Sequence, residues 1–193
     1  MPDFMPDDVY SKLFDFYLAE LAGSLGRVLK TDCWNEAKAL PAPGGVLPLL
    51  DGWPLLAIDN DPAIVAEART RVRDGVVFGV GDIRALAFPK WSFDTILDLS
   101  TLDHIPWPDV PAALGEYWRA LRPRGRLYLG VWCAEDVLDE PIDGLSLRQY
   151  TFPEQELLAA VAAAGFTTRH KHVYWTGREK RFVRLNLRKR GHA

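Results

Sequence analysis

Acidic residues end successive apolar runs in the first half of the chain. The run at residues 55–59 ends in Asp59, the run at 76–82 ends in Asp82, and the run at 93–98 ends in Asp98. In a parallel α/β sheet, ligands bind outside the carboxyl ends of the strands. One carboxylate can accept both hydroxyl donors of a ribose diol, so this repeated placement predicts a ligand that carries a nucleoside.

The elements that would position these carboxylates alternate along most of the chain. An amphipathic helix is expected at residues 7–24 and a short helix at 35–40, before prolines and glycines break the pattern. Asp61 can cap a helix at 62–72, and Thr151 with Glu154 has the spacing of a capping box that opens a helix at 151–164. The remaining expected elements are a helix at 108–121, strands at 27–32, 55–59, 76–82, 93–98 and 126–132, and a closing hairpin of strands 167–176 and 181–188.

This alternation predicts an α/β fold, with a mostly parallel sheet, an antiparallel addition at its end and helices on both faces. The composition agrees with one globular domain, because 193 residues can bury a sizeable core and 48% of them are apolar. The net charge of −3 gives no general case for nucleic-acid binding. A late basic cluster favours a solvated strand edge and tail over a contact with RNA or an anionic substrate; it comprises Arg178, Lys180, Arg181, Arg184, Arg188, Lys189 and Arg190.

The cysteine count and the termini bear on the environment of the protein. Cys33 and Cys133 are the two cysteines, so no disulfide framework is predicted, and no paired Cys/His spacing indicates a zinc site. Residues 1–5 are acidic and lack an apolar signal core, and no uncharged run approaches the roughly 18 residues of a membrane span. We therefore expect a reduced, cytoplasmic protein without a metal and without membrane contact.

From Arg27 onward, the order of elements resembles the class I S-adenosylmethionine-dependent methyltransferases. The helix at 151–164, followed by Gly165-Phe166, matches the late helix of that family. The other matching stretches are Leu56-Ala57-Ile58-Asp59, Val80-Gly81-Asp82-Ile83, Leu86-Ala87-Phe88, Ser92-Phe93-Asp94-Thr95-Ile96-Leu97 and Ala120-Leu121-Arg122-Pro123-Arg124-Gly125-Arg126-Leu127.

The resemblance implies a Rossmann-like, seven-stranded sheet, S-adenosylmethionine as cofactor and S-adenosylhomocysteine as product. It divides the chain into a helix that covers the site, residues 1–26, and a methyltransferase domain, residues 27–193. Asp59 would accept hydrogen bonds from the ribose hydroxyls and Asn60 would lie along the adenosine edge. Asp82 would accept from the adenine amino group, with Ile83 against the ring. The competing interpretations are a helix-capping carboxylate for Asp59 and a turn residue for Asp82.

The methionine end departs from the family pattern, which has a glycine-rich loop after the first strand. Residues 30–36 contain no glycine. Lys30 and Asp32 are two residues apart and share one strand face, so Asp32 could pair with the ammonium of the cofactor and Lys30 with its carboxylate. Trp34 and Asn35 would line the methionine moiety. The alternatives are a buried Lys30–Asp32 pair with Trp34 in the core, or loss of cofactor binding.

The segment after residue 98 carries the candidate base. The family places residues near the transferred methyl group here, so Asp98 and Leu99 are expected near the methionine end. His104 could take a proton from a hydroxyl or phenol acceptor, with Asp103 orienting the ring. A strand-end role for Asp98, satisfied by backbone donors, and a structural His104 beside Trp107 remain the alternatives.

Substrate contacts are expected from two sides of this site. The connection at 135–150 is the predicted lid, and the first helix could close the site opposite to it, although its aromatic residues could equally belong to the core. The candidates are Tyr10, Phe14, Tyr17, Trp132, Arg148 and Tyr150. Because no inserted domain and no aromatic–basic nucleic-acid motif is visible, we expect a small-molecule acceptor. The acceptor atom (oxygen, nitrogen or carbon) and the oligomeric state stay open.

Two other functions remain possible on the sequence. The glycine-free loop would suit a catalytically silent methyltransferase-like domain that acts as a binding or scaffold partner. A nucleotide-dependent oxidoreductase is disfavoured, because the glycine fingerprint of dinucleotide-binding folds is absent.

Overall fold

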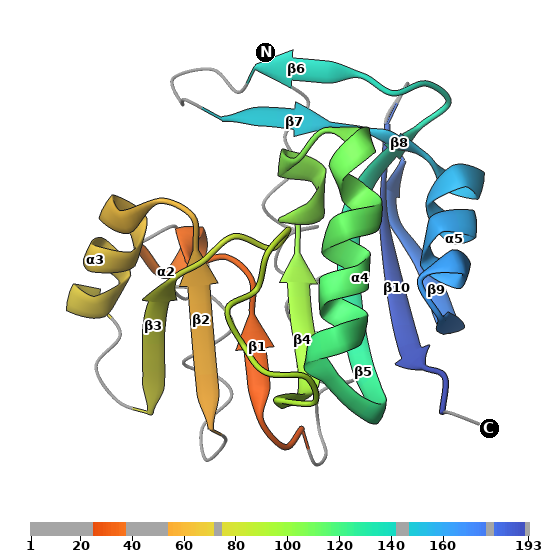
Figure 1. Ribbon diagram of the computed structural model, residues 1–193. Helices are drawn as coiled ribbons and strands as arrows, with labels where there is room; N and C mark the ends of the chain where they lie inside the picture. The colour runs from red at the N-terminus through yellow and green to blue at the C-terminus, as the bar shows by residue number, and fades with distance from the viewer. Residues whose placement is uncertain (1–24, 38–53, 72–74, 142–146, 177–179, 192–193) are drawn as a thin grey trace.

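A computed structural model describes residues 25–37, 54–71, 75–141, 147–176 and 180–191. One sheet runs through the molecule in the order β3-β2-β1-β4-β5-β10-β9, with short β8 (Phe152–Pro153) pairing in parallel with β5 (Figure 1). The pairs from β3 to β5 are parallel, and β10 is antiparallel to both β5 and β9. The strands of this path are β1 (Val28–Lys30), β2 (Leu55–Asp59), β3 (Val76–Val80), β4 (Phe93–Leu99), β5 (Leu121–Ala134), β9 (Phe166–Thr176) and β10 (Arg181–Lys189).

This topology confirms the predicted fold class. The order of the parallel strands reverses at β1, which pairs with β2 on one side and with β4 on the other. A ligand is expected at such a reversal, outside the carboxyl ends of the strands. The acidic strand ends predicted from the sequence therefore lie on the edge where an α/β protein binds its ligand.

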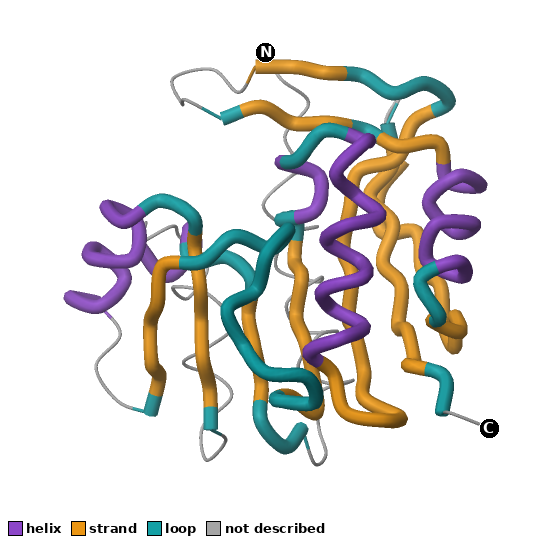
Figure 2. The backbone as a smooth tube through the Cα atoms, viewed as in Figure 1, coloured by secondary structure: helices purple, strands orange, loops and turns teal. Residues whose placement is uncertain are grey.

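Helices cover both faces of the sheet, as expected (Figure 2). Helix α4 (Val110–Ala120) buries Val110, Ala113, Leu114 and Tyr117 at helical spacing, and together with α5 (Glu154–Ala163) it packs on one apolar cluster. Helices α2 (Trp34–Ala37) and α3 (Pro62–Arg71) belong with the second cluster on the other face. Neighbouring strand residues such as Val28 and Leu29 go to different clusters, since side chains alternate across a strand.

Local hydrogen bonds explain where the sequence prediction was right and where it was wrong. Asp61 caps α3 as predicted, because its Oδ1 accepts from the N–H of Ala63 at 2.8 Å. The capping box at Thr151 was wrong: helix α5 starts after Pro153, and the Thr151 hydroxyl donates to the carbonyl of Asp136 and accepts from the N–H of Leu138. Thr151 thereby fixes the base of a separate two-stranded sheet that the sequence did not predict.

That small sheet consists of β6 (Asp139–Pro141) and β7 (Arg148–Tyr150). It lies across the end of the main sheet at which β4 and β5 finish, above the start of α4 (Figure 1). The predicted lid region thus contains regular structure. Strand β3 ends at Val80 rather than at residue 82, because the N–H of Gly81 donates to the carbonyl of Asp59 and a turn follows, in which the N–H of Ala85 donates to the carbonyl of Asp82.

Candidate functional site

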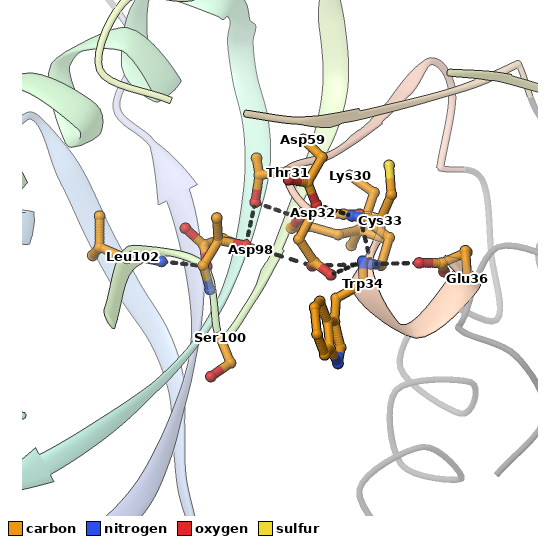
Figure 3. Close-up of polar contacts among 12 residues, drawn as sticks. Lys30, Thr31, Asp32, Cys33, Trp34, Glu36, Asp59, Asp98, Ser100 and Leu102 are labelled. Atoms are coloured by element: carbon orange, nitrogen blue, oxygen red, sulfur yellow. Dashed lines mark hydrogen bonds and ion pairs between the residues drawn. The ribbon is translucent and has the colours of Figure 1, made fainter. Parts of the chain in front are cut away.

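The carboxyl ends of β1, β2 and β4 bring a group of polar side chains together (Figure 3). The segment after β1 is held on both sides. The N–H of Thr31 donates to the carbonyl of Leu97 at 3.1 Å, and the N–H of Cys33 donates to Asp59 Oδ2 at 3.0 Å. This loop therefore has a defined path without glycine, and its side chains lie at the ends of β1 and β2.

Lys30 is the centre of a buried charge cluster. Its side chain is fully buried, and Nζ donates to Asp32 Oδ2 at 2.9 Å, to the carbonyl of Asp32 at 2.8 Å and to Glu36 Oε2 at 3.0 Å. Burial alone would lower the pKa of Lys30, but the two carboxylates outweigh it and raise the pKa, so the ammonium stays charged. All three N–H donors of the Lys30 ammonium are therefore used within the chain. This arrangement agrees with the alternative interpretation of Lys30 and Asp32 as a buried pair, rather than with a contact between Lys30 and the cofactor carboxylate.

Glu36 is a site residue that the sequence analysis missed. It is 1% exposed, and its Oε1 has no hydrogen-bond partner in the described part of the chain, while Oε2 holds Lys30. One lysine faces two carboxyl groups here, beside Asp59, and burial raises the pKa of Glu36. The contact between Glu36 and Lys30 forms only in the folded structure, and no sequence motif with a spacing of six residues predicts it.

Asp59 joins the ends of β1 and β2. Its Oδ2 accepts from Cys33 and its Oδ1 accepts from the N–H of Asp61 at 3.0 Å. Burial raises the pKa of Asp59, while these two backbone donors oppose the rise. A carboxylate has about four acceptor positions, so two remain for a ligand. Helix capping falls to Asp61, so the competing interpretation of Asp59 as the cap does not describe this structure. Asn60 beside it is exposed.

Asp82 lies in the turn after β3 and is covered by Arg84. Nε and Nη2 of Arg84 donate to the carboxylate at 2.7–3.1 Å, and Nη1 donates to Asp109 at 2.8 Å. The hydrogen bond from Arg84 lowers the pKa of Asp82. Ile83 is buried in the core cluster together with Ile58 and is 5% exposed. Asp82 is therefore a turn residue with an exposed ion pair, and Ile83 is mainly a core residue.

Asp98 is buried in β4 and satisfied by the fold. Its Oδ1 accepts from the N–H groups of Thr101 and Leu102 at 2.9 and 3.1 Å, and its Oδ2 accepts from the Tyr117 hydroxyl at 2.6 Å. Burial raises the pKa of Asp98 to about 7. The structure thus places Asp98 in the strand-end role, reinforced by a tyrosine that the sequence did not link to it, and leaves Leu99 half-buried.

His104 ends a short 3₁₀ helix (Leu102–His104) under β7. Its Nδ1 lies 2.7 Å from the carbonyl of Arg148. A carbonyl only accepts, so Nδ1 carries the proton and Nε2 of the neutral ring is left as a proton acceptor. The expected orienting role of Asp103 is corrected, because that fully buried carboxylate accepts instead from Ser100 Oγ at 2.9 and 3.0 Å and from the N–H of Trp132.

The expected substrate residues fall into different environments. Trp132 is 8% exposed and packs edge-on against Phe182 at 5.4 Å between ring centroids, which makes it a core residue. Arg148 is exposed and forms an ion pair with Asp139 across the β6–β7 sheet, while Tyr150 is half-buried. Trp34 and Asn35 lie half-buried on α2. Tyr10, Phe14 and Tyr17, and with them the expected covering helix at 1–26 up to residue 24, lie outside the described residues.

The described residues contain no group of three or more side chains that could hold a metal ion. Cys33 and Cys133 are both buried free thiols. Among the helices that the structure describes, none is long and apolar enough to cross a membrane.

Comparison with known proteins identifies relatives of this arrangement. The family model described as a methyltransferase domain matches residues 37–129. The chain is 30% identical over 141 residues to nocamycin O-methyltransferase of Saccharothrix syringae. This match covers 70% of this chain and 45% of that protein. It is 31% identical over 118 residues to EEF1A lysine methyltransferase 4 of Bos taurus, covering 53% of this chain and 44% of that protein. The chain thus spans less than half the length of these two relatives.

A solved structure with the same fold is 1,6-didemethyltoxoflavin-N1-methyltransferase of Burkholderia thailandensis, determined with bound 1,6-didemethyltoxoflavin and S-adenosylhomocysteine. It superimposes with a TM-score of 0.71 at 19% identity, and the match covers 96% of this chain and 80% of that one. At this identity, the likeness establishes the shared fold.

Proposed function

The chain belongs, by its fold and its matching domain, to the class I S-adenosylmethionine-dependent methyltransferases, and from this premise we propose that it transfers the methyl group of S-adenosylmethionine to a small-molecule acceptor. The observation that carries the proposal is the carboxylate of Asp59, which is half-buried at the end of β2 and has two unused acceptor positions. Strand β2 neighbours β1, the strand at which the order of the parallel strands reverses. The two acceptor positions match the two hydroxyl donors of a ribose.

The carboxyl groups of Asp32 and Glu36, after the end of β1, support the binding of a cationic group of the ligand. Glu36 Oε1 is buried and unpartnered among the described residues, and the Lys30 cluster has more carboxylates than cations. A buried acceptor without a donor costs free energy that a ligand ammonium would recover. We propose that Asp32 and Glu36 bind the cationic methionine end, with Lys30 holding both carboxylates in place.

The adenine end requires one rearrangement. Asp82 would accept from the adenine amino group after Arg84 moves aside. The Asp82–Arg84 pair is about 40% exposed on each side, and exposed ion pairs contribute about 0–1 kcal/mol, so its opening has a small cost. Arg84 retains Asp109 as a partner in the open state.

When bound, S-adenosylmethionine supplies an electrophilic methyl group. The protein then has to align the acceptor in line with that group and exclude water. The β6–β7 sheet lies over the carboxyl edge, and its Arg148 carbonyl keeps the Nδ1 proton of His104 in place. Nε2 of His104 is thereby left as the proton acceptor for a hydroxyl or phenol that attacks the methyl group.

A small molecule is the acceptor class that we propose. Nocamycin O-methyltransferase and the toxoflavin N1-methyltransferase bear names that point to small acceptors, whereas the bovine relative is named for a lysine of a protein. The match to nocamycin O-methyltransferase covers 70% of this chain, whereas the match to the lysine methyltransferase covers 53%.

Replacing Asp59 by alanine is expected to weaken the affinity for S-adenosylmethionine by about 1–3 kcal/mol, because the ribose hydroxyls lose their acceptor. Titration calorimetry measures this change. Asp61→Ala is the matched control: it removes a neighbouring carboxylate that caps α3, so it should lower stability by about 1 kcal/mol and leave affinity unchanged. Equal affinities of wild type and Asp59→Ala would remove the ribose role.

Replacing His104 by alanine is expected to lower turnover about 10²–10⁴-fold once an acceptor is in hand, with cofactor affinity nearly intact. His170→Ala, which changes an exposed histidine on β9, serves as the control and should keep the wild-type rate. A His104→Ala enzyme with the wild-type rate and pH profile would make His104 a structural residue.

A further inference from the structure

The carboxyl group of Glu36 is buried with too few donors to hold a negative charge. Glu36 is 1% exposed, and its Oε2 accepts from Lys30 Nζ at 3.0 Å. Its Oε1 has no hydrogen-bond partner among the residues that the structure describes. A buried carboxylate oxygen without a donor costs more free energy than the neutral carboxyl group does. The geometry therefore favours a protonated Glu36 in the free protein.

The charges next to Glu36 do not compensate for its burial. Lys30 lies between Glu36 and Asp32, and it gives its two other hydrogen bonds to Asp32, at 2.8 and 2.9 Å (Figure 3). Asp59, at the end of β2, adds another carboxyl group on the same side of the sheet. Burial is the largest influence on the pKa of Glu36 and raises it, while Lys30 opposes the rise and Asp32 adds to it.

The described cations of helix α3, which packs against α2, are engaged elsewhere. Arg71 pairs with Glu67 on the same helix, and Arg69 donates to the carbonyl of Phe78 on β3. The thiol of Cys33, which follows β1, stays protonated because burial raises its pKa well above its usual range. One cation thus serves all the carboxyl groups around Glu36 in the described part of the site.

We propose that Glu36 holds a proton in the free protein and releases it to solvent when the ammonium of S-adenosylmethionine binds beside it. This inference rests on the proposed function and concerns the same site. The O–H bond of the carboxyl group breaks, and the carboxylate that forms pairs with the ammonium, which supplies the donor that Oε1 lacks. The affinity for the cofactor then rises with pH, by up to tenfold per pH unit when one proton is released.

The test is titration calorimetry of the full chain with S-adenosylmethionine and with S-adenosylhomocysteine at pH 6.5. An α-amino group has an ordinary pKa of about 7.7–8.0, so the free ligands already carry their ammonium at this pH. Each titration is run in PIPES and in imidazole, two buffers of different ionisation enthalpy, and the difference in observed heat gives the number of protons released. Both ligands should release the proton, because both carry the ammonium. Both affinities should rise from pH 5.5 to 7.

Glu36→Gln mimics the protonated carboxyl group. It should unfold at nearly the wild-type urea concentration at pH 5.5 and release fewer protons on binding than the wild type. Its affinity for S-adenosylmethionine should match that of the wild type near pH 5.5 and be about tenfold weaker at pH 7, because glutamine forms no charged hydrogen bond with the ammonium.

Two further variants separate Glu36 from other carboxyl groups. Glu67→Gln is the matched control, because it makes the same change at an exposed position on α3, and it should release as many protons as the wild type. Asp98→Asn removes the other buried carboxyl group whose pKa is raised, to about 7, and the proton from Glu36 should still be released in it.

The inference is overturned if the wild type binds without releasing a proton, if Glu36→Gln releases as many protons as the wild type, or if Glu67→Gln loses as many as Glu36→Gln. If Glu36→Gln does not fold, infrared difference spectra of Asp98→Asn decide. Loss of a carboxylic-acid C=O band on binding supports the inference, and an unchanged band overturns it. Absence of saturable binding at every pH contradicts the proposed function itself, whereas binding without this proton contradicts the inference alone.

Discussion

Replacing Lys30 by methionine is expected to lower the free energy of unfolding by about 3–5 kcal/mol, the cost of leaving buried charges without their partner. Nζ is fully buried and contacts both Asp32 and Glu36, so its loss leaves two carboxylates close together with no cation between them. Urea unfolding monitored by circular dichroism measures the change.

The control is the triple variant Lys30→Met, Asp32→Asn, Glu36→Gln. It removes all three charges at once, so no buried charge is left without a partner. We expect it to recover most of the stability that Lys30→Met loses. A loss below 1 kcal/mol in the single variant would mean that Lys30 does not hold these carboxylates together.

The free energy of unfolding is expected to fall as pH rises from about 4 to 7, because Asp98 is protonated in the native state over a range in which the unfolded chain releases that proton. Burial raises the native pKa of Asp98 to about 7. The stabilisation is complete below the unfolded pKa and is lost as pH approaches the native one. One pKa unit corresponds to about 1.4 kcal/mol, so this group accounts for up to about 4 kcal/mol.

Asp98→Asn mimics the protonated carboxyl and keeps an acceptor for the N–H groups of Thr101 and Leu102. Urea unfolding from pH 4.5 to 8 should therefore show a flatter profile in this variant. Some slope should remain, since burial also raises the pKa of neighbouring Asp103. Parallel profiles of wild type and variant would contradict a titrating Asp98.

The repeating patterns of the chain predicted most of its architecture. Strands β2, β4 and β10 and helices α3 and α4 lie within a few residues of their expected ranges, because alternating or helical apolar spacing marks residues that must be buried. The main errors arose at contacts between distant segments. The local sequence at Thr151 is typical of a helix cap, yet its hydroxyl donates to the carbonyl of Asp136 and accepts from the N–H of Leu138.

The candidate site was predictable only in part for the same reason. Asp59 and Asp98 lie at the ends of β2 and β4 as expected, because parallel strands end at one edge, while their contacts with a cofactor stay predictions. The partners of these carboxylates were not predictable. Glu36 under Lys30 and Tyr117 on Asp98 come together only through tertiary packing, and local spacing carries no signal for such contacts.

The most direct test of the account is titration calorimetry of the wild-type chain with S-adenosylmethionine and S-adenosylhomocysteine. The central claim is that the carboxyl ends of β1 and β2 bind this cofactor through Asp59 and the Lys30 cluster. Saturable binding of both ligands is predicted, with the cationic S-adenosylmethionine bound more tightly because the cluster has an excess of carboxylates. The absence of any heat of binding at millimolar ligand would contradict it.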